Sequence, residues 1–379
     1  MSEIATPRPM PSWLDAWHVN PSANRDYDFI DGLRGIAILM VVCCHGLYVN
    51  PNSGPTTQFF GALAAAGSGG VILFYGLSGF LISWPFWKRK FAMGREVIPP
   101  GYARRRFWKI YPPLALSILL LTPVYLCLTH DHSFIPIAAK WLAGIPFIWP
   151  VSGKLNPVMW TLVIEAQFYM TLPFVFLVLK RVPARTCLWI IPLVFLLVPL
   201  AFRALTGLTA GFQPDINSHY PSALDAFCFG IFVAGLDNQG AVGKKWAALG
   251  IAGVLLWLAA VLLHAWAGGS QDICVGWMEK IGTGFLLFFV ANPQHPVARF
   301  LCAPALRWCG LFSYEWYLFH QPSFDWTRQI FGAAGGNVAL YAAIVGIPLL
   351  ASLSLSAFTY RCFSLPLLKR GRAGKKGTA

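Results

Sequence analysis

Long apolar stretches separated by short polar loops dominate the chain. A helix that crosses a bilayer needs about 20 mostly apolar residues, and most of these stretches approach that length. They cover residues 29–49, 59–87, 107–129, 156–179, 186–203, 219–236, 246–266, 281–295, 305–322 and 337–360. The pattern predicts an all-α, polytopic membrane protein with about ten transmembrane helices.

The second stretch, 59–87, is unusually long and contains the glycine-rich run GALAAAGSGGVILFYGLSGF. Glycine weakens a helix because its backbone is so free. Non-helical backbone at membrane depth is tolerated only where it is buried in protein or lines a cavity. We therefore predict a broken or kinked helix here, forming one wall of a site.

Composition agrees with a membrane protein. Of 379 residues, 56% are hydrophobic and 12% charged, whereas soluble domains carry about 25% charged residues. This excludes an ordinary soluble globule, and the aromatic content excludes a disordered chain. The nine cysteines lie mostly in apolar runs without C-x-x-C or Cys/His spacing, so no metal site is predicted.

The basic charge has a topological explanation. The formal net charge is +14, which in a soluble protein would suggest nucleic acid as partner. If both termini are cytoplasmic, 23 of the 29 Lys and Arg residues fall on the cytoplasmic side and 5 on the other. This asymmetry is the positive-inside pattern. It predicts a multi-pass protein of the plasma (inner) membrane, with the lipid bilayer and not nucleic acid as partner.

The same pattern divides the chain into three parts. We expect a cytoplasmic N-terminal segment at 1–28, a membrane domain at 29–360 and a basic cytoplasmic tail at 361–379.

Ionisable residues within apolar segments are the candidate chemistry, because they are costly in a bilayer. The first segment contains Asp31, Arg34 and His45. At 100° per residue, Arg34 and His45 lie about 20° apart around the helix and roughly 16 Å apart along it. The three form one polar column, although a structural Asp31–Arg34 pair with an unrelated histidine is the alternative.

A basic, aromatic stretch precedes the third apolar segment. GYARRRFWKIYPP contains Arg105, Arg106 and Lys109, with Trp108 and Tyr111 beside them. Topology alone would explain such a cluster. It also suits a ligand that carries several phosphates and an aromatic base, through charge and stacking.

Three later segments also contain isolated polar residues. Glu165 and His320 are candidate site residues, and Tyr317 lies near His320 in LFSYEWYLFHQP. Asp225 and Ser313 are interpreted as polar contacts between helices, a common use of such residues in membranes.

Five motifs in order resemble one known family. They are DGLRGIAILMVVCCH, GGVILFYGLSGFLIS, RRRFWKIYP, WTLVIEAQFY and SYEWYLFHQP. Together they resemble the acyltransferase 3 family of integral-membrane O-acyltransferases. Two positions depart from the family pattern: Lys109 stands where a second arginine is usual, and Thr161 stands where a serine is usual.

The resemblance implies transfer of an acyl group, often acetyl, from cytosolic acyl-CoA to a hydroxyl. Implied acceptors are carbohydrates, glycolipids and macrolides, and acyl-CoA is a donor substrate and not a bound cofactor. On this interpretation Arg34, Arg105, Arg106 and Lys109 lie near the donor phosphates. His45 is the general base, since an imidazole titrates near neutral pH. Glu165 supports His45, and His320, Tyr317 and Ser78 line the acceptor side.

A proton-coupled secondary transporter or flippase is the alternative function. It would use Asp31, Arg34 and His45 as a proton relay. Such proteins often contain inverted repeats, and none is visible in the sequence.

Overall fold

The molecule is helical throughout the part of the chain that the structure describes. The structure is a computed structural model, and it describes residues 12–18, 27–47, 55–92, 96–148, 156–206, 223–267, 273–332 and 338–373. No strand occurs within these ranges, which confirms the all-α prediction.

The α-helices are α1 (Ser12–Asp15), α2 (Asp28–Gly46), α3 (Pro55–Ala65), α4 (Gly70–Phe91), α5 (Tyr102–Thr129), α6 (Phe134–Leu142), α7 (Trp160–Val178), α8 (Ala184–Thr206), α10 (Asp225–Asn238), α11 (Ala247–Trp266), α12 (Ile273–Leu286), α13 (Pro296–Leu301), α14 (Pro304–Leu311), α15 (Ser313–Phe331), α16 (Val338–Thr359) and α17 (Leu365–Ala373). The 3₁₀ segments are η2 (Ala66–Gly69), η3 (Ile145–Phe147), η4 (Lys244–Trp246) and η5 (Leu287–Ala291), and η6 (Tyr360–Ser364) is a π-helix.

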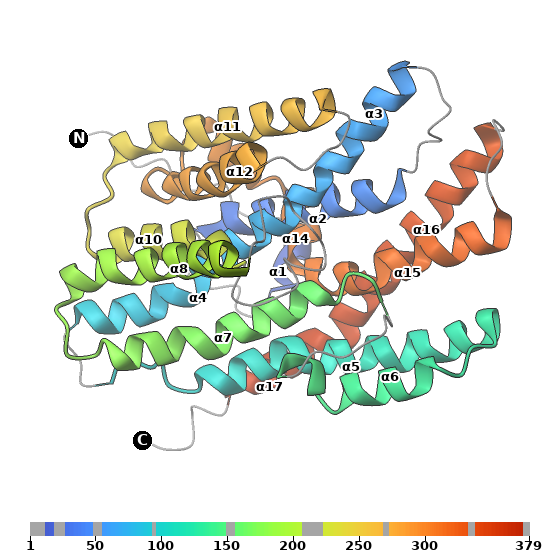
Figure 1. Cartoon of the computed structure of the whole chain (residues 1–379), viewed down its shortest axis with the longest axis horizontal. Coiled ribbons are helices and arrows are strands. Elements are labelled where there is room, and N and C mark those ends of the chain that lie inside the picture. The colour runs from blue at the N-terminus through green and yellow to red at the C-terminus, as the bar shows by residue number, and fades with distance from the viewer. Residues whose placement is uncertain are drawn as a thin grey trace.

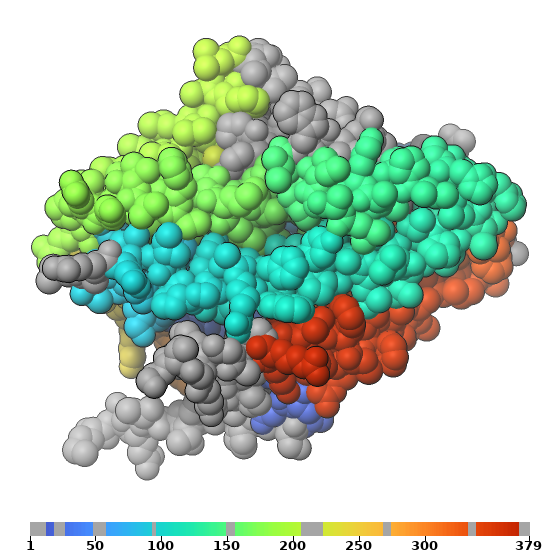
Figure 2. All heavy atoms as spheres, turned by 90° about the horizontal axis from the view of Figure 1, so that it is seen from below, coloured from blue at the N-terminus to red at the C-terminus, as the bar shows by residue number. Residues whose placement is uncertain are grey.

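Most of the long helices run side by side along the long axis of the molecule (Figure 1). Helix α4 packs on α10, α11 on α12, α2 on α14, and α15 on α16. Viewed from below, α5 crosses the middle of the face in cyan to teal, with α17 in red beside it (Figure 2). The long helices thus form a bundle around α2 and α4, which supply much of the site.

Eight helical stretches in the described ranges are long and apolar enough to cross a membrane. They are Asp28–Gly46, Gln58–Phe91, Tyr102–Thr129, Trp160–Val178, Ala184–Leu205, Lys244–Trp266, Cys274–Ala291 and Ala339–Arg370. Large apolar side chains such as Trp189 and Phe174 are exposed on the bundle surface, as a lipid-facing surface requires. The structure confirms a multi-spanning helical architecture, and the predicted total of ten remains a prediction.

Two predicted segments differ in the structure. The segment predicted at 305–322 is split, because α14 ends at Leu311 and α15 starts at Ser313. The segment predicted at 219–236 begins outside the described residues, and its helix α10 spans 14 residues. Helix α15 carries so many polar side chains that its mean hydropathy is low, and internal hydrogen bonds satisfy several of them.

The predicted break in the glycine-rich segment is confirmed. Helix α3 ends at Ala65, the 3₁₀ segment η2 follows, and α4 starts at Gly70. A Cβ atom on Gly67 would lie 2.1 Å from the carbonyl oxygen of Met40 in α2. Only glycine allows η2 to approach α2 so closely, so the break forms where two backbones meet.

Close backbone contact also joins α2 to α14. A Cβ atom on Gly35 would lie 2.0 Å from the carbonyl oxygen of Leu306. A Cβ on Gly310 would lie 1.8 Å from the carbonyl oxygen of Asp31. Small residues that permit such approach are typical of helix interfaces in membranes.

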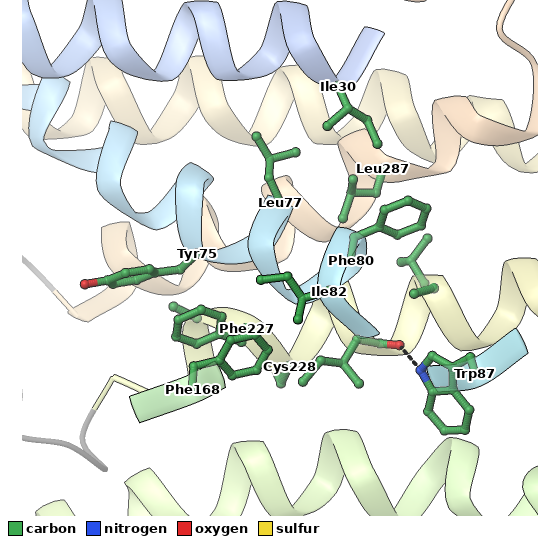
Figure 3. Packing of buried hydrophobic residues seen from close by; sticks show 14 of the residues in the cluster. Ile30, Tyr75, Leu77, Phe80, Ile82, Trp87, Phe168, Phe227, Cys228 and Leu287 are labelled. Carbon is green, nitrogen blue, oxygen red and sulfur yellow. Dashed lines mark hydrogen bonds between the residues drawn. The ribbon is translucent and has the colours of Figure 1, made fainter. Parts of the chain in front are cut away.

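Aromatic rings fill the core between α4, α7 and α10 (Figure 3). Phe168 stacks on Phe227 with ring centroids 4.0 Å apart. The indole Nε1 of Trp87 donates a hydrogen bond to the carbonyl oxygen of Ile231 at 2.9 Å. This core holds α4 and α7, two walls of the cavity described below, in fixed relation.

The described N-terminal residues lie against the far end of the chain. Trp17 stacks on Tyr360 with ring centroids 6.2 Å apart, and its carbonyl oxygen accepts a hydrogen bond from the Tyr360 hydroxyl at 2.9 Å. Arg361 donates a hydrogen bond to the carbonyl oxygen of Ala16. Residues 12–18 and η6 therefore lie at the same end of the bundle.

Candidate active site

A cavity opens between α2, α4, α5, α7 and α15, and its atom-free space of about 730 Å³ includes the part that is open to solvent. Its lining residues are Arg34, Val71, Phe74, Tyr75, Leu77, Ser78, Leu81, Ile82, Arg106, Lys109, Ile110, Thr161, Leu162, Glu165, Tyr169, Ser313, Tyr314 and Tyr317. Charged and hydroxyl groups from five helices thus converge in an otherwise apolar and aromatic space.

Three cations line the cavity. Arg106 and Lys109 lie three residues apart on α5 and so share a face of the helix. Neither makes an ion pair with another described residue. Arg34 of α2 donates a hydrogen bond from its Nη2 to the Oγ of Ser313 at 3.1 Å. The cavity therefore holds two cations, Arg106 and Lys109, that no ion pair among the described residues neutralises.

Glu165 is the single carboxylate among the lining residues. Its Oε1 accepts a hydrogen bond from the Ser78 hydroxyl at 2.9 Å and another from the Tyr169 hydroxyl. The guanidinium of Arg106 lies over the Tyr169 ring, 5.5 Å from its centroid. Both bonds go to Oε1, and Oε2 makes no hydrogen bond within the part of the chain that the structure describes.

Two histidines pair beyond the cavity wall. The Nδ1 atom of His45 and the Nε2 atom of His320 are 2.9 Å apart, a hydrogen-bond distance. His320 is fully buried, and its Nδ1 lies 3.1 Å from the carbonyl oxygen of Trp316 and 2.9 Å from that of Tyr317. The pair joins the end of α2 to α15.

Tyr317 connects the cavity with this pair. It lines the cavity, and its ring centroid is 5.6 Å from that of His320. Its hydroxyl accepts a hydrogen bond from the Thr161 hydroxyl at 2.8 Å and donates one to the carbonyl oxygen of Val158. The cavity and the histidine pair are therefore adjacent parts of one polar region.

The structure brings most of the predicted residues together but rearranges their relations. Arg34, Ser78, Arg106, Lys109, Glu165 and Tyr317 all line this cavity, so the residues predicted near the donor and those predicted near the acceptor share one space.

Arg105 is separated from this group. It is not a lining residue, and its Nη1 donates a hydrogen bond to the carbonyl oxygen of Pro100. Consecutive helical residues point about 100° apart, so Arg105 cannot share the face of Arg106. Trp108 and Tyr111 are not lining residues either, and the Tyr111 hydroxyl bonds to Leu142.

Glu165 and His320 have different contacts in the structure. The carboxylate bonds of Glu165 go to Ser78 and Tyr169, while the ring of His45 bonds to His320. The structure gives no hydrogen bond between Glu165 and His45 among the described residues. His320 is 0% exposed and contacts His45.

The polar residues interpreted as interhelical contacts act as such. Asp225 of α10 forms ion pairs with Arg203 of α8 and with Lys280 of α12, the latter at 2.7 Å. Ser313 joins α15 to α2 through Arg34. Among the described residues Arg34 forms no ion pair with Asp31.

One further residue escaped the sequence interpretation, which counted Arg328 only as a topological charge. Its Nη2 donates hydrogen bonds to the carbonyl oxygens of His45 and Gly46. These carbonyls belong to the last turn of α2, where a cation is favourable. The signal available in the sequence was an arginine eight residues after His320, on the same helix.

Comparison with known proteins identifies related sequences. A family model described as an acyltransferase domain matches residues 27–357. The chain is 25% identical to the peptidoglycan O-acetyltransferase OatA of Listeria monocytogenes, over 90% of this chain and 56% of that protein. It is 22% identical to the O-acetyltransferase OatA of Staphylococcus aureus, over 90% of this chain and 57% of that protein.

A third relative matches a shorter stretch. The acyltransferase MdmB of Streptomyces mycarofaciens is 27% identical, over 42% of each chain. The chain spans somewhat more than half the length of the OatA proteins. No solved structure matches.

Proposed function

The chain belongs to the family of acyltransferase domains, and from this premise we propose that it is a multi-pass membrane O-acyltransferase. It transfers an acyl group, in the first instance acetyl, from acyl-CoA to a hydroxyl of a carbohydrate or glycolipid. His45 is the general base of this reaction.

The observation that carries the proposal is the uncompensated positive charge in the cavity. Arg34, Arg106 and Lys109 face it with one carboxylate, Glu165, and Arg106 and Lys109 make no ion pair among the described residues. An anionic ligand would neutralise them, and arginine can bind phosphate with two parallel hydrogen bonds. Acyl-CoA carries several phosphates on an extended arm that ends in the reactive thioester.

The position of Tyr317 suggests how the thioester meets the base. With the donor phosphates at Arg106 and Lys109, the arm would extend past Tyr317 towards His45 and His320. His45 then takes the proton of the acceptor hydroxyl as its oxygen attacks the thioester carbonyl carbon. The C–S bond breaks, and the leaving thiolate takes the proton back from His45.

The relatives favour a carbohydrate acceptor. Two of them are named O-acetyltransferases, and one name specifies peptidoglycan. A macrolide is the competing acceptor class. Cytosolic acyl-CoA requires the basic end of α5 to face the cytoplasm, with the whole molecule in the plasma (inner) membrane. The contact of Trp17 with Tyr360 supports placing residues 12–18 and η6 on the same side of the membrane as each other.

The test uses purified protein in detergent with radiolabelled acetyl-CoA and, as acceptor probes, a soluble peptidoglycan fragment and a macrolide. Wild-type protein is expected to release CoA thiol and to label the peptidoglycan fragment in preference to the macrolide. In His45→Ala, transfer is expected to fall about 10²–10⁴-fold, or about 3–5 kcal/mol of barrier, while acetyl-CoA binding stays nearly unchanged. The protein should stay folded, with stability lowered by about 1–3 kcal/mol because the buried His320 loses its partner.

His132→Ala is the matched control, since His132 lies in an exposed turn after α5, and it should retain full transfer. A stable His45→Ala protein with wild-type transfer would contradict the assignment of the base. Absence of both acetyl-CoA binding and thiol release in wild type would contradict the donor.

A further inference from the structure

The hydrogen bonds of His320 fix which of its ring nitrogens carries a proton. Its Nδ1 faces two backbone carbonyl oxygens, those of Trp316 at 3.1 Å and Tyr317 at 2.9 Å. A carbonyl oxygen can only accept a hydrogen bond. The Nδ1 of His320 must therefore be the protonated nitrogen.

The opposite nitrogen of His320 is then an acceptor. Its ring is fully buried, and no carboxylate is within hydrogen-bond distance of it among the described residues. A buried imidazolium without a counter-charge is strongly disfavoured, so the ring is neutral and its Nε2 carries a lone pair. This lone pair lies 2.9 Å from the Nδ1 of His45.

The tautomer of His45 follows from that of His320. The Nδ1 of His45 must donate the hydrogen bond between the rings, because the Nε2 of His320 can only accept it. In neutral His45 the lone pair then belongs to Nε2. That nitrogen has no hydrogen-bond partner among the described residues, and the His45 side chain is partly exposed.

The backbones of both histidines are held in place. Arg328 donates hydrogen bonds to the carbonyl oxygens of His45 and Gly46. A Cβ atom on Gly46 would lie 2.6 Å from the ring of Phe324, so glycine at this position leaves room for that ring of α15 against α2. Phe324 lies one helical turn after His320. The contact between the rings of His45 and His320 is thus part of the interface between α2 and α15.

We propose that His320 is a positioning residue that holds His45 in the Nδ1–H tautomer, with the Nε2 lone pair available to the acceptor hydroxyl. The inference rests on the proposed function and extends it. It assigns to a neutral histidine the task that a buried carboxylate performs in a Ser-His-Asp triad. Because the hydrogen-bond acceptor His320 is neutral, the membrane-embedded site does not have to bury a second charge.

Two conservative substitutions separate this role from packing. In His320→Gln the side-chain oxygen can reach the position of the imidazole Nε2 and accept from His45. In His320→Asn the shorter amide reaches only the position of Nδ1 and leaves the Nε2 position empty. Both are neutral amides, so they differ mainly in whether His45 has a partner.

The measurements are kcat for acetyl transfer to the peptidoglycan fragment, KM for acetyl-CoA, and the melting temperature. We expect His320→Gln to retain kcat within about tenfold of wild type, and His320→Asn to lose about 10²-fold or more. KM for acetyl-CoA should be unchanged in both, because the donor phosphates bind elsewhere. If His320→Asn fails to accumulate, His320→Leu replaces it as a side chain without a hydrogen-bond acceptor, with the same expected loss of kcat.

Equal kcat values for His320→Gln and His320→Asn would overturn the inference. Losses of kcat that merely follow the loss of melting temperature would overturn it as well. His45→Ala distinguishes this failure from failure of the proposed function. If His45→Ala is inactive while the His320 variants are equally active, only the role of His320 is wrong. If His45→Ala is fully active, the general base is misassigned and the inference falls with it.

Discussion

The Oγ of Ser313 accepts a hydrogen bond from the Nη2 of Arg34 at 3.1 Å, and it donates one to the carbonyl oxygen of Gly310 at 2.9 Å. A side chain of α15 thereby holds the cation of α2 in the cavity. Helical periodicity alone places Arg34 on a face, but this bond determines the direction of its guanidinium.

Ser313→Ala is expected to weaken acetyl-CoA binding about tenfold, because a hydrogen bond to a charged group contributes about 1.5–3 kcal/mol and 1.4 kcal/mol corresponds to tenfold in Kd. Ser323→Ala is the matched control. Ser323 lies on the same helix and also bonds back to a carbonyl, that of Phe319 at 2.8 Å. Titration calorimetry with acetyl-CoA measures both, and equal Kd values for the two variants would refute the role of Ser313.

Arg106→Ala should weaken acetyl-CoA binding more than Lys109→Ala. Arginine can bind a phosphate with two parallel hydrogen bonds, whereas lysine offers a point charge. Arg105→Ala should leave Kd nearly unchanged, because Arg105 lies outside the cavity. If Arg105→Ala and Arg106→Ala weaken binding equally, the basic stretch acts through its overall charge and not through the cavity.

Gly35→Ala is expected to destabilise the protein by about 1–3 kcal/mol or more, the usual range for overpacking. The new methyl group would lie 2.0 Å from the carbonyl oxygen of Leu306, and backbone cannot rotate away. Gly346→Ala in α16 should be neutral or stabilising, since no atom lies within 4 Å and alanine favours helix. Thermal unfolding in detergent compares them, and similar melting temperatures would show that α2 and α14 can separate at little cost.

Asp225→Asn should destabilise the protein by about 3–5 kcal/mol, the range for breaking a buried ion pair. The substitution leaves Arg203 and Lys280 without the carboxylate that pairs with both. Asp131→Asn, at an exposed carboxylate, should leave the melting temperature unchanged. Retained stability in Asp225→Asn would mean that water or lipid headgroups neutralise the two cations.

Reporter fusions test the orientation. Fusions at Val182 and at the C-terminus are expected to report cytoplasm, and fusions at His132 and Gly268 the opposite side. The expectation follows from the distribution of Lys and Arg along the sequence. A cytoplasmic signal from His132 would reverse the side on which α5 ends.

Much of the architecture could be predicted from the sequence, because whether a segment is apolar enough to cross a membrane depends on its own residues alone. The glycine-rich run marks the break at η2 correctly, since Gly67 and Gly70 lie against the backbone of α2 and Gly69 lies against the side chain of Glu279. The division between α14 and α15 at Phe312 could not be predicted. Polar side chains of α15 form hydrogen bonds with other helices, for example with α2. The composition of α15 alone therefore does not show that the helix is buried.

The membership of the site was predictable, but its internal contacts were not. Ionisable residues in apolar segments pointed to Arg34, Glu165 and His320, because such residues are costly without a purpose. Which of them meet depends on the rotation and depth of each helix, and periodicity along one helix contains no information about its neighbour. Hence Glu165 was assigned to His45, whereas His320, 275 residues away in the chain, is its partner.

The distance in sequence between α2 and its partners has a consequence for biogenesis. Arg34 and Ser313 are 279 residues apart, and at synthesis rates of about 5–20 residues per second the ribosome needs roughly 15–55 s to deliver the second after the first. During that interval Arg34 lacks its bond to Ser313, and Gly35 lacks the backbone of α14 that packs against it. The contacts of α2 with α14 and α15 therefore form only after most of the chain has been made.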